Sequence, residues 1–311
     1  MGSSICTLGS PICTPASAPH DKIVFKLTVD TTKLLPSNPA GFALEELTKS
    51  CNRTGWTLSP TAKSKGITKE PPMHVQFLDT DAAELRASHV ILRFRHGAVK
   101  PGEDELRDFT LKHRDEGVPT MASLKALDCA SVPCKSSMKI QHCTGKDGPD
   151  YGVYASFKNK KSKLHCNDLL DVMRKSGISI QDAAPVSGTG AQFIEIFPVL
   201  EEYLAPDVRI SNHGLVIQQD EWVLGKHTAT SESGKVKFEP SLILWSDAAQ
   251  PYNGAFCGEL TWDTKSDEDE LQKELFDDLM DGLGDLLSND NKTAAAYKQM
   301  QWHMADFDGK D

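Results

Sequence analysis

Short segments in which apolar and charged residues alternate are the feature that most constrains the fold of this 311-residue chain. In a strand, the side chains of every second residue point to the same side of the sheet. The run Val90-Ile-Leu-Arg-Phe-Arg95 has this alternation. Arg93 and Arg95 therefore share one face, and the apolar residues around them share the other. The pattern is typical of a strand whose apolar face is covered and whose opposite face is cationic.

The same alternation recurs in other segments. In the run Lys22-Ile-Val-Phe-Lys-Leu-Thr-Val29, cations on one face stand opposite apolar residues on the other. The residues that repeat this pattern are Lys22, Lys26, Thr110, Lys112, Lys158 and Lys160. Several strands thus have an apolar side that must pack against other residues and an opposite side that carries positive charge.

Twelve segments have strand character, and few have helical character. The strands are predicted at Lys22–Val29, Val75–Leu78, Val90–Arg95, Arg107–His113, Met138–Cys143, Val153–Lys158, Phe193–Phe197, Leu215–Gln218, Trp222–Lys226, Val236–Phe238, Leu242–Trp245 and Phe256–Trp262. Helices are predicted at 40–51, Leu169–Lys175 and 266–287, with a helical turn at Ala82–Ala87. This composition predicts an α+β fold, with an antiparallel sheet or barrel and helices packed outside.

The last helix is also the main acidic segment. Ser266 is its predicted N-cap, and leucines recur every three or four residues to give one apolar face. The window 263–290 holds eleven acids against two bases, while the whole chain has a formal charge of −10. The rest is therefore nearly neutral and can carry local basic patches. The acidic balance disfavours nucleic acid as a partner.

The other composition features bound the location and the domain layout. No run approaches the ~18 apolar residues of a membrane span. The eight cysteines form no CxxC pair and the N-terminus lacks a secretory pattern, so we expect a reducing, cytoplasmic location. We expect a flexible tail at 1–20, one barrel domain at 21–298 that includes the helix 266–287, and a second tail at 299–311.

One stretch resembles a known family. The run Gln76-Phe-Leu-Asp-Thr-Asp-Ala-Ala-Glu-Leu-Arg-Ala-Ser-His-Val-Ile-Leu-Arg-Phe-Arg95, followed by Thr110-Leu-Lys112, is similar to the signature of the CYTH, or triphosphate tunnel metalloenzyme, family. That signature reads aromatic-x-Asp-Thr, then Leu-x6-Leu-Arg-x-Arg, then Thr-Leu-Lys. The strands Leu242–Trp245 and Phe256–Thr261 resemble the family's late strand pair.

The resemblance implies a tunnel of eight antiparallel strands that binds a tri- or diphosphate-bearing substrate and cleaves a phosphoanhydride or phosphoester bond with Mg2+ or Mn2+. Glu259 matches the first acid of a late Glu-x-Glu metal site, and this makes it the candidate catalytic residue. The residues that match substrate-binding positions, or extend them, are Lys26, Arg93, Arg95, Lys112 and Lys158.

The chain differs from the family at the acidic positions of its motifs. The family's first motif, Glu-x-Glu-x-Lys, reads Lys22-Ile-Val24-Phe-Lys26 here, and the second acid of the late pair is Thr261. Divalent cations such as Mg2+ take oxygen ligands, usually carboxylates. Either the metal is held differently, or the protein binds its anion without this chemistry. A non-catalytic binder of polyphosphate or nucleotides is therefore one alternative.

A second alternative rests on the acidic helix. Asp277-Asp-Leu-Met-Asp281 matches the DDxxD pattern with which terpene synthases bind magnesium and diphosphate. Asp277 and Asp281 lie one helical turn apart, so both could bind one metal ion. This predicts a lyase or terpene cyclase that ionises a prenyl diphosphate. An ordinary acidic amphipathic helix produces the same pattern easily.

Overall fold

The computed structural model describes residues 22–97, 106–115, 135–143, 150–158, 173–179, 186–212, 216–249, 254–264 and 269–287. The predicted tails, the predicted N-cap Ser266 and most of the predicted helix Leu169–Lys175 lie outside these residues. The boundaries of the predicted barrel domain stay a prediction. In the part of the chain that the structure describes, no helix is both long and apolar enough to cross a membrane.

The strands make up most of the described chain. They are β1 Lys22–Val29, β2 Thr57–Pro60, β3 Thr68–Lys69, β4 Met73–Thr80, β5 Val90–Gly97, β6 Leu106–Asp115, β7 Lys135–Cys143, β8 Asp150–Lys158, β9 Ser187–Thr189, β10 Arg209–Asn212, β11 Ile217–Val223, β12 His227–Thr230, β13 Lys235–Phe238, β14 Ser241–Asp247 and β15 Cys257–Thr264. The helices are α1 Pro39–Arg53, α2 Glu84–Ala87, α5 Gly190–Ile196 and α6 Asp269–Leu283, with 3-10 turns at Thr31–Lys33, Pro198–Glu202 and Gly284–Leu286.

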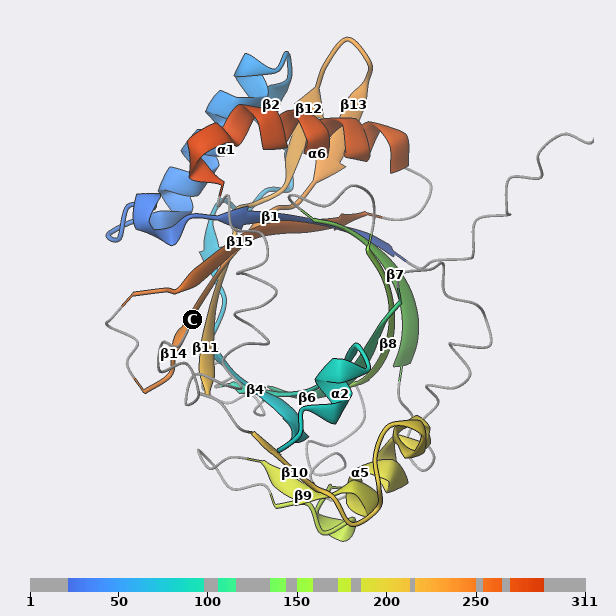
Figure 1. The fold of residues 1–311 in the computed structure, drawn as a ribbon. Helices are drawn as coiled ribbons and strands as arrows, with labels where there is room; N and C mark the ends of the chain where they lie inside the picture. The colour runs from blue at the N-terminus through green and yellow to red at the C-terminus, as the bar shows by residue number, and fades with distance from the viewer. Residues whose placement is uncertain are drawn as a thin grey trace, which may run out of the picture.

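Twelve of the strands form one strongly curled sheet. Its hydrogen-bonded order is β3-β11-β14-β15-β1-β7-β8-β6-β5-β4-β10-β9, and β11 pairs with β4 as well. This extra pairing, Ile217 with Val75 through Gln219 with Met73, brings together the two ends of a nine-strand run. Figure 1 shows these strands curving round into a ring, with α1 and α6 outside it on one side and α5 outside it on the other.

The sheet differs from the expected eight antiparallel strands in two respects. The run from β11 round to β4 has nine strands, and β1 pairs with β7 in parallel. The remaining ladders of this run are antiparallel. A parallel pair cannot be joined by a tight hairpin. In the sequence, β1 and β7 are separated by all the elements from β2 to β6. No local sequence pattern therefore reveals that these two strands pair.

The helices α1 and α6 cover the outer side of β1 and β15. The apolar residues of β1, from Ile23 to Val29 at every second position, pack with Leu260 and Trp262 of β15 and with the apolar stripe of α6. Phe25 stacks on Trp262 with ring centroids 5.3 Å apart, and it contacts Phe276 of α6 at 5.4 Å. This core uses the odd-numbered positions of β1, so the even-numbered positions face inward.

The helix α5 covers the outer side of β5 and β6 in the same way. Leu92 and Phe94 of β5 pack with Phe109 and Leu111 of β6 against this helix. The strand predicted at Phe193–Phe197 is wrong, because Gly190–Ile196 forms α5. A capping box between Thr189 and Gln192 starts this helix, and Phe193 and Ile196 lie three residues apart on its buried side.

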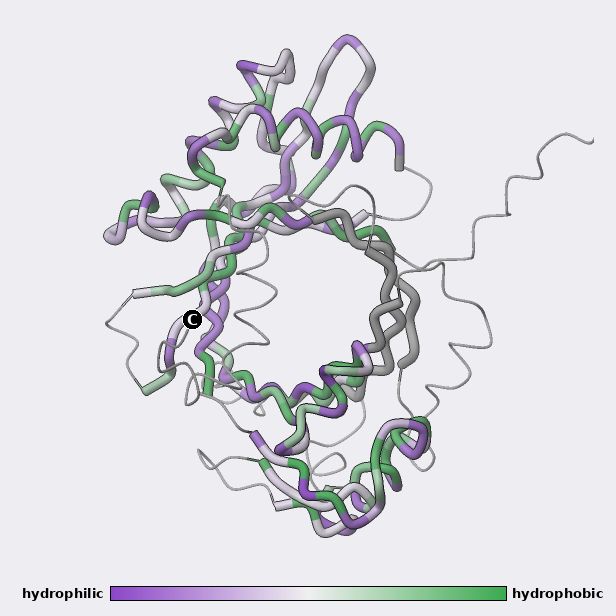
Figure 2. Tube along the Cα trace, in the orientation of Figure 1, coloured by the Kyte–Doolittle hydropathy of each residue, from purple (hydrophilic) through white to green (hydrophobic). Residues whose placement is uncertain are grey.

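Most of the other predicted strands are confirmed with small shifts of their ends. The segments predicted at Leu215–Gln218, of which Leu215 lies outside the described residues, and at Trp222–Lys226 belong to the single strand β11, Ile217–Val223. The long predicted helix 266–287 is observed as α6 followed by a 3-10 turn. The alternation of hydrophobic and hydrophilic residues along the strands can be followed in Figure 2.

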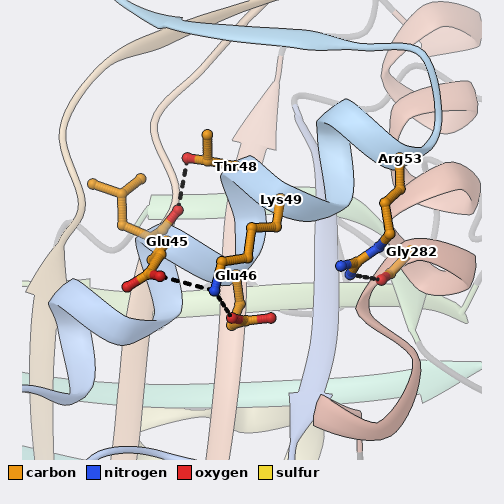
Figure 3. Close-up of polar contacts among 7 residues, drawn as sticks. Glu45, Glu46, Thr48, Lys49, Arg53 and Gly282 are labelled. Carbon is orange, nitrogen blue, oxygen red and sulfur yellow. Dashed lines mark hydrogen bonds and ion pairs between the residues drawn. The ribbon is translucent and has the colours of Figure 1, made fainter.

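The two outer helices α1 and α6 approach each other closely at Gly282. A Cβ atom at this position would collide with Oγ of Ser50 and lie 3.1 Å from its Cβ. Next to it, the Arg53 guanidinium donates a hydrogen bond to the Gly282 carbonyl (Figure 3). A cation at the C-terminal end of a helix is favourable because the last carbonyls carry partial negative charge.

Gly282→Ala should lower the free energy of unfolding by about 1–3 kcal/mol, because the new methyl group overpacks the contact with Ser50. Urea denaturation measures this change. Asp281→Ala is the matched control, since Asp281 is the exposed neighbour on the same helix turn. If Gly282→Ala is as stable as this control, the close approach of the two helices is incorrect.

Candidate functional site

The arginines of β5 lie on the inner face of the curled sheet. Leu92 and Phe94 point to the outer side, where α5 covers them. Arg93 and Arg95 alternate with these residues, so they take the opposite face. Both side chains are half-buried rather than fully covered.

Lys112 of β6 belongs to the same cationic cluster. Arg93 pairs with Thr110, and Ile91 pairs with Lys112, so Arg93 and Lys112 are diagonal neighbours on one face. Such neighbours are about 7–8 Å apart, within reach of long side chains. Lys112 is only 8% exposed and Thr110 only 3%. The pair of strands β5 and β6 therefore holds three cations on one side.

Lys158 extends this cluster by its position in the ladder. Its backbone in β8 is paired with Asp108 of β6, which is in turn paired with Arg95 of β5. The side chain of Lys158 lies outside the described residues. Its role as a ligand contact stays a prediction.

A second group on the inner face combines Lys26 and Glu259. Lys26 of β1 pairs with Thr261 of β15, and Thr28 pairs with Glu259. The lysine and the glutamate are therefore diagonal neighbours, with Glu259 only 6% exposed. The Thr261 hydroxyl donates a 3.0 Å hydrogen bond to the Phe25 carbonyl. The sequence placed both charged residues at one site, and the register brings them side by side.

The structure separates the aspartates of the DDxxD pattern from Glu259. Asp277 and Asp281 lie on α6, which packs on the outer side of β15, whereas Glu259 faces the inner side. One metal ion therefore cannot be held by Glu259 together with these two aspartates. Asp277 forms an ion pair with Lys273 at 2.7 Å, an ordinary contact on a helix surface. Binding of a metal by Asp277 and Asp281 alone stays a prediction.

A multi-ligand metal site is not found among the described residues. No three side chains of His, Cys, Asp or Glu in the described ranges lie close enough together to hold an ion. This agrees with the replacement of the family's acids at Val24 and Thr261, both on the inner face beside Lys26 and Glu259. The described donor set therefore does not fit the two-metal arrangement that the resemblance implies.

Asp79 holds the turn that leads into the arginine strand, a role that the sequence did not predict. Its buried carboxylate accepts hydrogen bonds from the backbone N–H groups of Thr80, Leu85 and Arg86, at 2.7, 2.9 and 3.0 Å. The Thr80 hydroxyl also accepts one from the Glu84 N–H at 3.2 Å. The only sequence signal for this role is an Asp-Thr pair shortly before a helical turn.

Strain in the same turn explains why so many bonds converge on Asp79. The short helix α2 starts after Ala83 and is followed by His89, and both have positive φ angles near 57°. This left-handed conformation is unfavourable for residues other than glycine. The bonds to Asp79 offset that cost and fix where β5 begins.

Asp79→Asn should lower the free energy of unfolding by about 1–3 kcal/mol. One carboxylate oxygen becomes an NH2 group, which cannot accept the bond from the Arg86 N–H and leaves this donor unsatisfied. Chemical denaturation measures the loss, and Asp81→Asn on the exposed side of the turn is the control. Equal stability of the two variants would show that Asp79 does not hold the turn.

The fold and the cationic inner face together define a class of protein: a curled β-sheet with helices outside and a cluster of cations on its inner side.

No family model and no curated protein matches the chain. Among solved structures, the chain is similar to a putative adenylyl cyclase from Hippeastrum, described as having a dominant triphosphatase activity. The two share 14% identity over 89% of this chain and 96% of that one, with a TM-score of 0.40. A likeness this weak carries neither fold nor function over to this chain.

Proposed function

We propose that this chain binds a di- or triphosphate group on the inner face of its curled sheet. The observation that carries the proposal is the placement of Arg93, Arg95 and Lys112 on one face of two paired strands. The opposite face of both strands is filled by apolar residues, so the cations cannot turn outward. Lys26 adds charge to the same inner side from β1.

Phosphate is the anion that best suits this cluster. Cations gathered on one concave face attract an anion that can lie between them, because charges of one sign in such a place focus the field on an oppositely charged ligand. Phosphate oxygens accept charge-assisted hydrogen bonds, and the planar guanidinium group binds two of them at once. A di- or triphosphate carries several negative charges in a row and can contact cations on neighbouring strands together.

The double variant Arg93→Ala with Arg95→Ala should weaken binding of tripolyphosphate at least a hundredfold, since each lost charged hydrogen bond is worth about 1.5–3 kcal/mol. Isothermal titration calorimetry gives the dissociation constants. The control is Arg209→Ala with Lys235→Ala, which removes two exposed cations from β10 and β13.

Equal affinity of the arginine variant and the wild type would contradict the proposal. An equal loss of affinity in both double variants would also contradict the proposal. Binding would then depend on the net charge of the protein rather than on the cations of the inner face.

Hydrolysis is the reaction for which the same face provides a candidate base. Glu259 is a buried carboxylate beside Lys26 and faces inward with the cations. In this step Glu259 takes a proton from water as the water oxygen attacks phosphorus. The bridging P–O bond breaks, and the released phosphate keeps the electron pair, stabilised by the cations.

Glu259→Gln should reduce release of phosphate from tripolyphosphate about 10²–10⁴-fold, the usual contribution of a general base. The affinity for tripolyphosphate should stay within a few-fold, because the amide keeps the size of the side chain. A colorimetric phosphate assay and calorimetry measure the two quantities. If the wild type releases no phosphate but binds tripolyphosphate, the chain is a binder without this chemistry.

The prenyl diphosphate alternative loses its main support in the structure. It depended on DDxxD aspartates next to the diphosphate-binding cations. Asp277 and Asp281 lie instead on α6, on the other side of β1 and β15 from Lys26 and Glu259. The cations alone do not distinguish a prenyl diphosphate from another organic phosphate.

A further inference from the structure

Two histidines lie side by side on the outer face of the sheet, on the opposite side from the cations. His74 of β4 is paired with His96 of β5. His96 follows Phe94 by two residues, and Phe94 packs under α5, so both histidines are on the outer side. Directly opposite residues of paired strands have Cβ atoms about 4.5–5.5 Å apart. The strand register therefore brings together two side chains that are far apart in the sequence.

The spacing of the two rings suits one metal ion between them. The ring centroids are 5.2 Å apart, and the ring planes are inclined by 75°. A nitrogen that binds Zn2+ lies about 2.0–2.1 Å from the metal and about 1.1 Å from its ring centre, so two imidazoles on a tetrahedral ion have centres about 5 Å apart. The observed distance agrees with this value, so both rings can bind one ion without any movement of the strands.

Rotation about one bond in each side chain aims a ring nitrogen at the shared ion. The Cβ–Cγ axis passes close to the ring centre, so this rotation moves the nitrogens and leaves the centroid distance nearly unchanged. The energy of this torsion has broad minima in histidine. The second nitrogen of each ring can keep a hydrogen bond while the first binds the metal. Both side chains are half-buried, so water can fill the remaining ligand positions.

The residues of β11 next to this pair are polar. Gln218 is paired with His74 on the side away from His96. Its Nε2 group donates a 2.7 Å hydrogen bond to Oδ2 of Asp220, so its Oε1 atom is the one that can accept from a metal-bound water. Asp220 forms an ion pair with Lys69 at 3.0 Å, which already engages its carboxylate. The protein therefore offers two imidazoles, without a carboxylate, to an ion at this position.

We propose that His74 and His96 form a binding site for a divalent ion that prefers imidazole ligands, such as Zn2+. Imidazole suits Zn2+, Cu2+ and Ni2+, whereas Mg2+ takes oxygen ligands. The site has two protein ligands, fewer than the groups of three that are absent from the described ranges. The ion links β4 to β5 close to the pairing of β4 with β11. Neither histidine belongs to the proposed phosphate site, so this inference does not depend on the proposed function.

NMR of the full chain, with ¹⁵N only in its histidines, tests this site. The signal of an imidazole nitrogen shifts when a metal binds to it. The variants His74→Gln and His96→Gln each remove one set of signals and so assign the two rings. We expect the signals of both rings to shift together as Zn2+ is added. The same signals should not shift when Mg2+ is added, because imidazole is a poor ligand for this ion.

The same variants test whether the two rings bind one ion. In His74→Gln, the signal of His96 should need at least tenfold more Zn2+ to shift. Even a partner outside the ligands of a metal contributes about 10–100-fold to its affinity, and a ligand contributes no less. The control is His89→Asn, which removes an exposed histidine just before β5. Asn tolerates the positive φ angle of this position, and the variant should leave the response of both rings unchanged.

Three results would overturn the site. The first is a shift of only one ring, or of other histidines alone, because the metal would then bind elsewhere. The second is an equal response of both rings to Mg2+. The third is an unchanged response of His96 in His74→Gln, because the two rings would then bind metal independently. If a variant does not fold, backbone assignment of the wild type identifies the two rings, and their joint response to Zn2+ still decides the matter.

Discussion

The two-residue period of the strands is the constraint on which the rest of this structure depends. Residues at every second position share a face, and covering one face with helices leaves the other for the remaining residues. The helices α1 and α6 cover one part of the sheet, and α5 covers another. The cations of β1, β5 and β6 therefore face the concave side together, although they are far apart in the sequence.

Curling of the sheet turns that shared face into a concave one. The pairing of β11 with β4 as well as β14 links strands from the two ends of the run. On the concave side the walls differ: β5 and β6 present Arg93, Arg95 and Lys112, while β4, β11 and β14 present apolar residues.

The sequence predicted the faces better than the arrangement of the strands. Alternation alone placed Arg93 with Arg95 and Thr110 with Lys112, because the period of a strand is a local property. The parallel pairing of β1 with β7 and the joining of two predicted segments into β11 are set by distant packing, which local patterns do not contain. Phe193–Phe197 was mistaken for a strand because a short apolar run fits both periods, and only the capping box at Thr189 favours the helix.

The prediction of the candidate site has the same limit, because local patterns do not show which elements pack together. The family resemblance assigned Lys26 and Glu259 to one site, and the register makes them diagonal neighbours on the inner face. The DDxxD aspartates on α6 lie on the outer side of the sheet, away from them. The role of Asp79 was missed because it depends on backbone N–H groups of the turn that follows it. Such partners appear only once the register is known.

A crystal structure of the chain with bound tripolyphosphate tests the central claim most directly. Our account predicts phosphate oxygens within hydrogen-bond distance of Arg93, Arg95 and Lys112 on the concave side of the sheet. The outer surface offers a competing location, a cavity of about 380 Å³ between α1 and the end of α6 that Lys33 and Arg53 line. Tripolyphosphate in that cavity, with none on the concave side, would contradict the account.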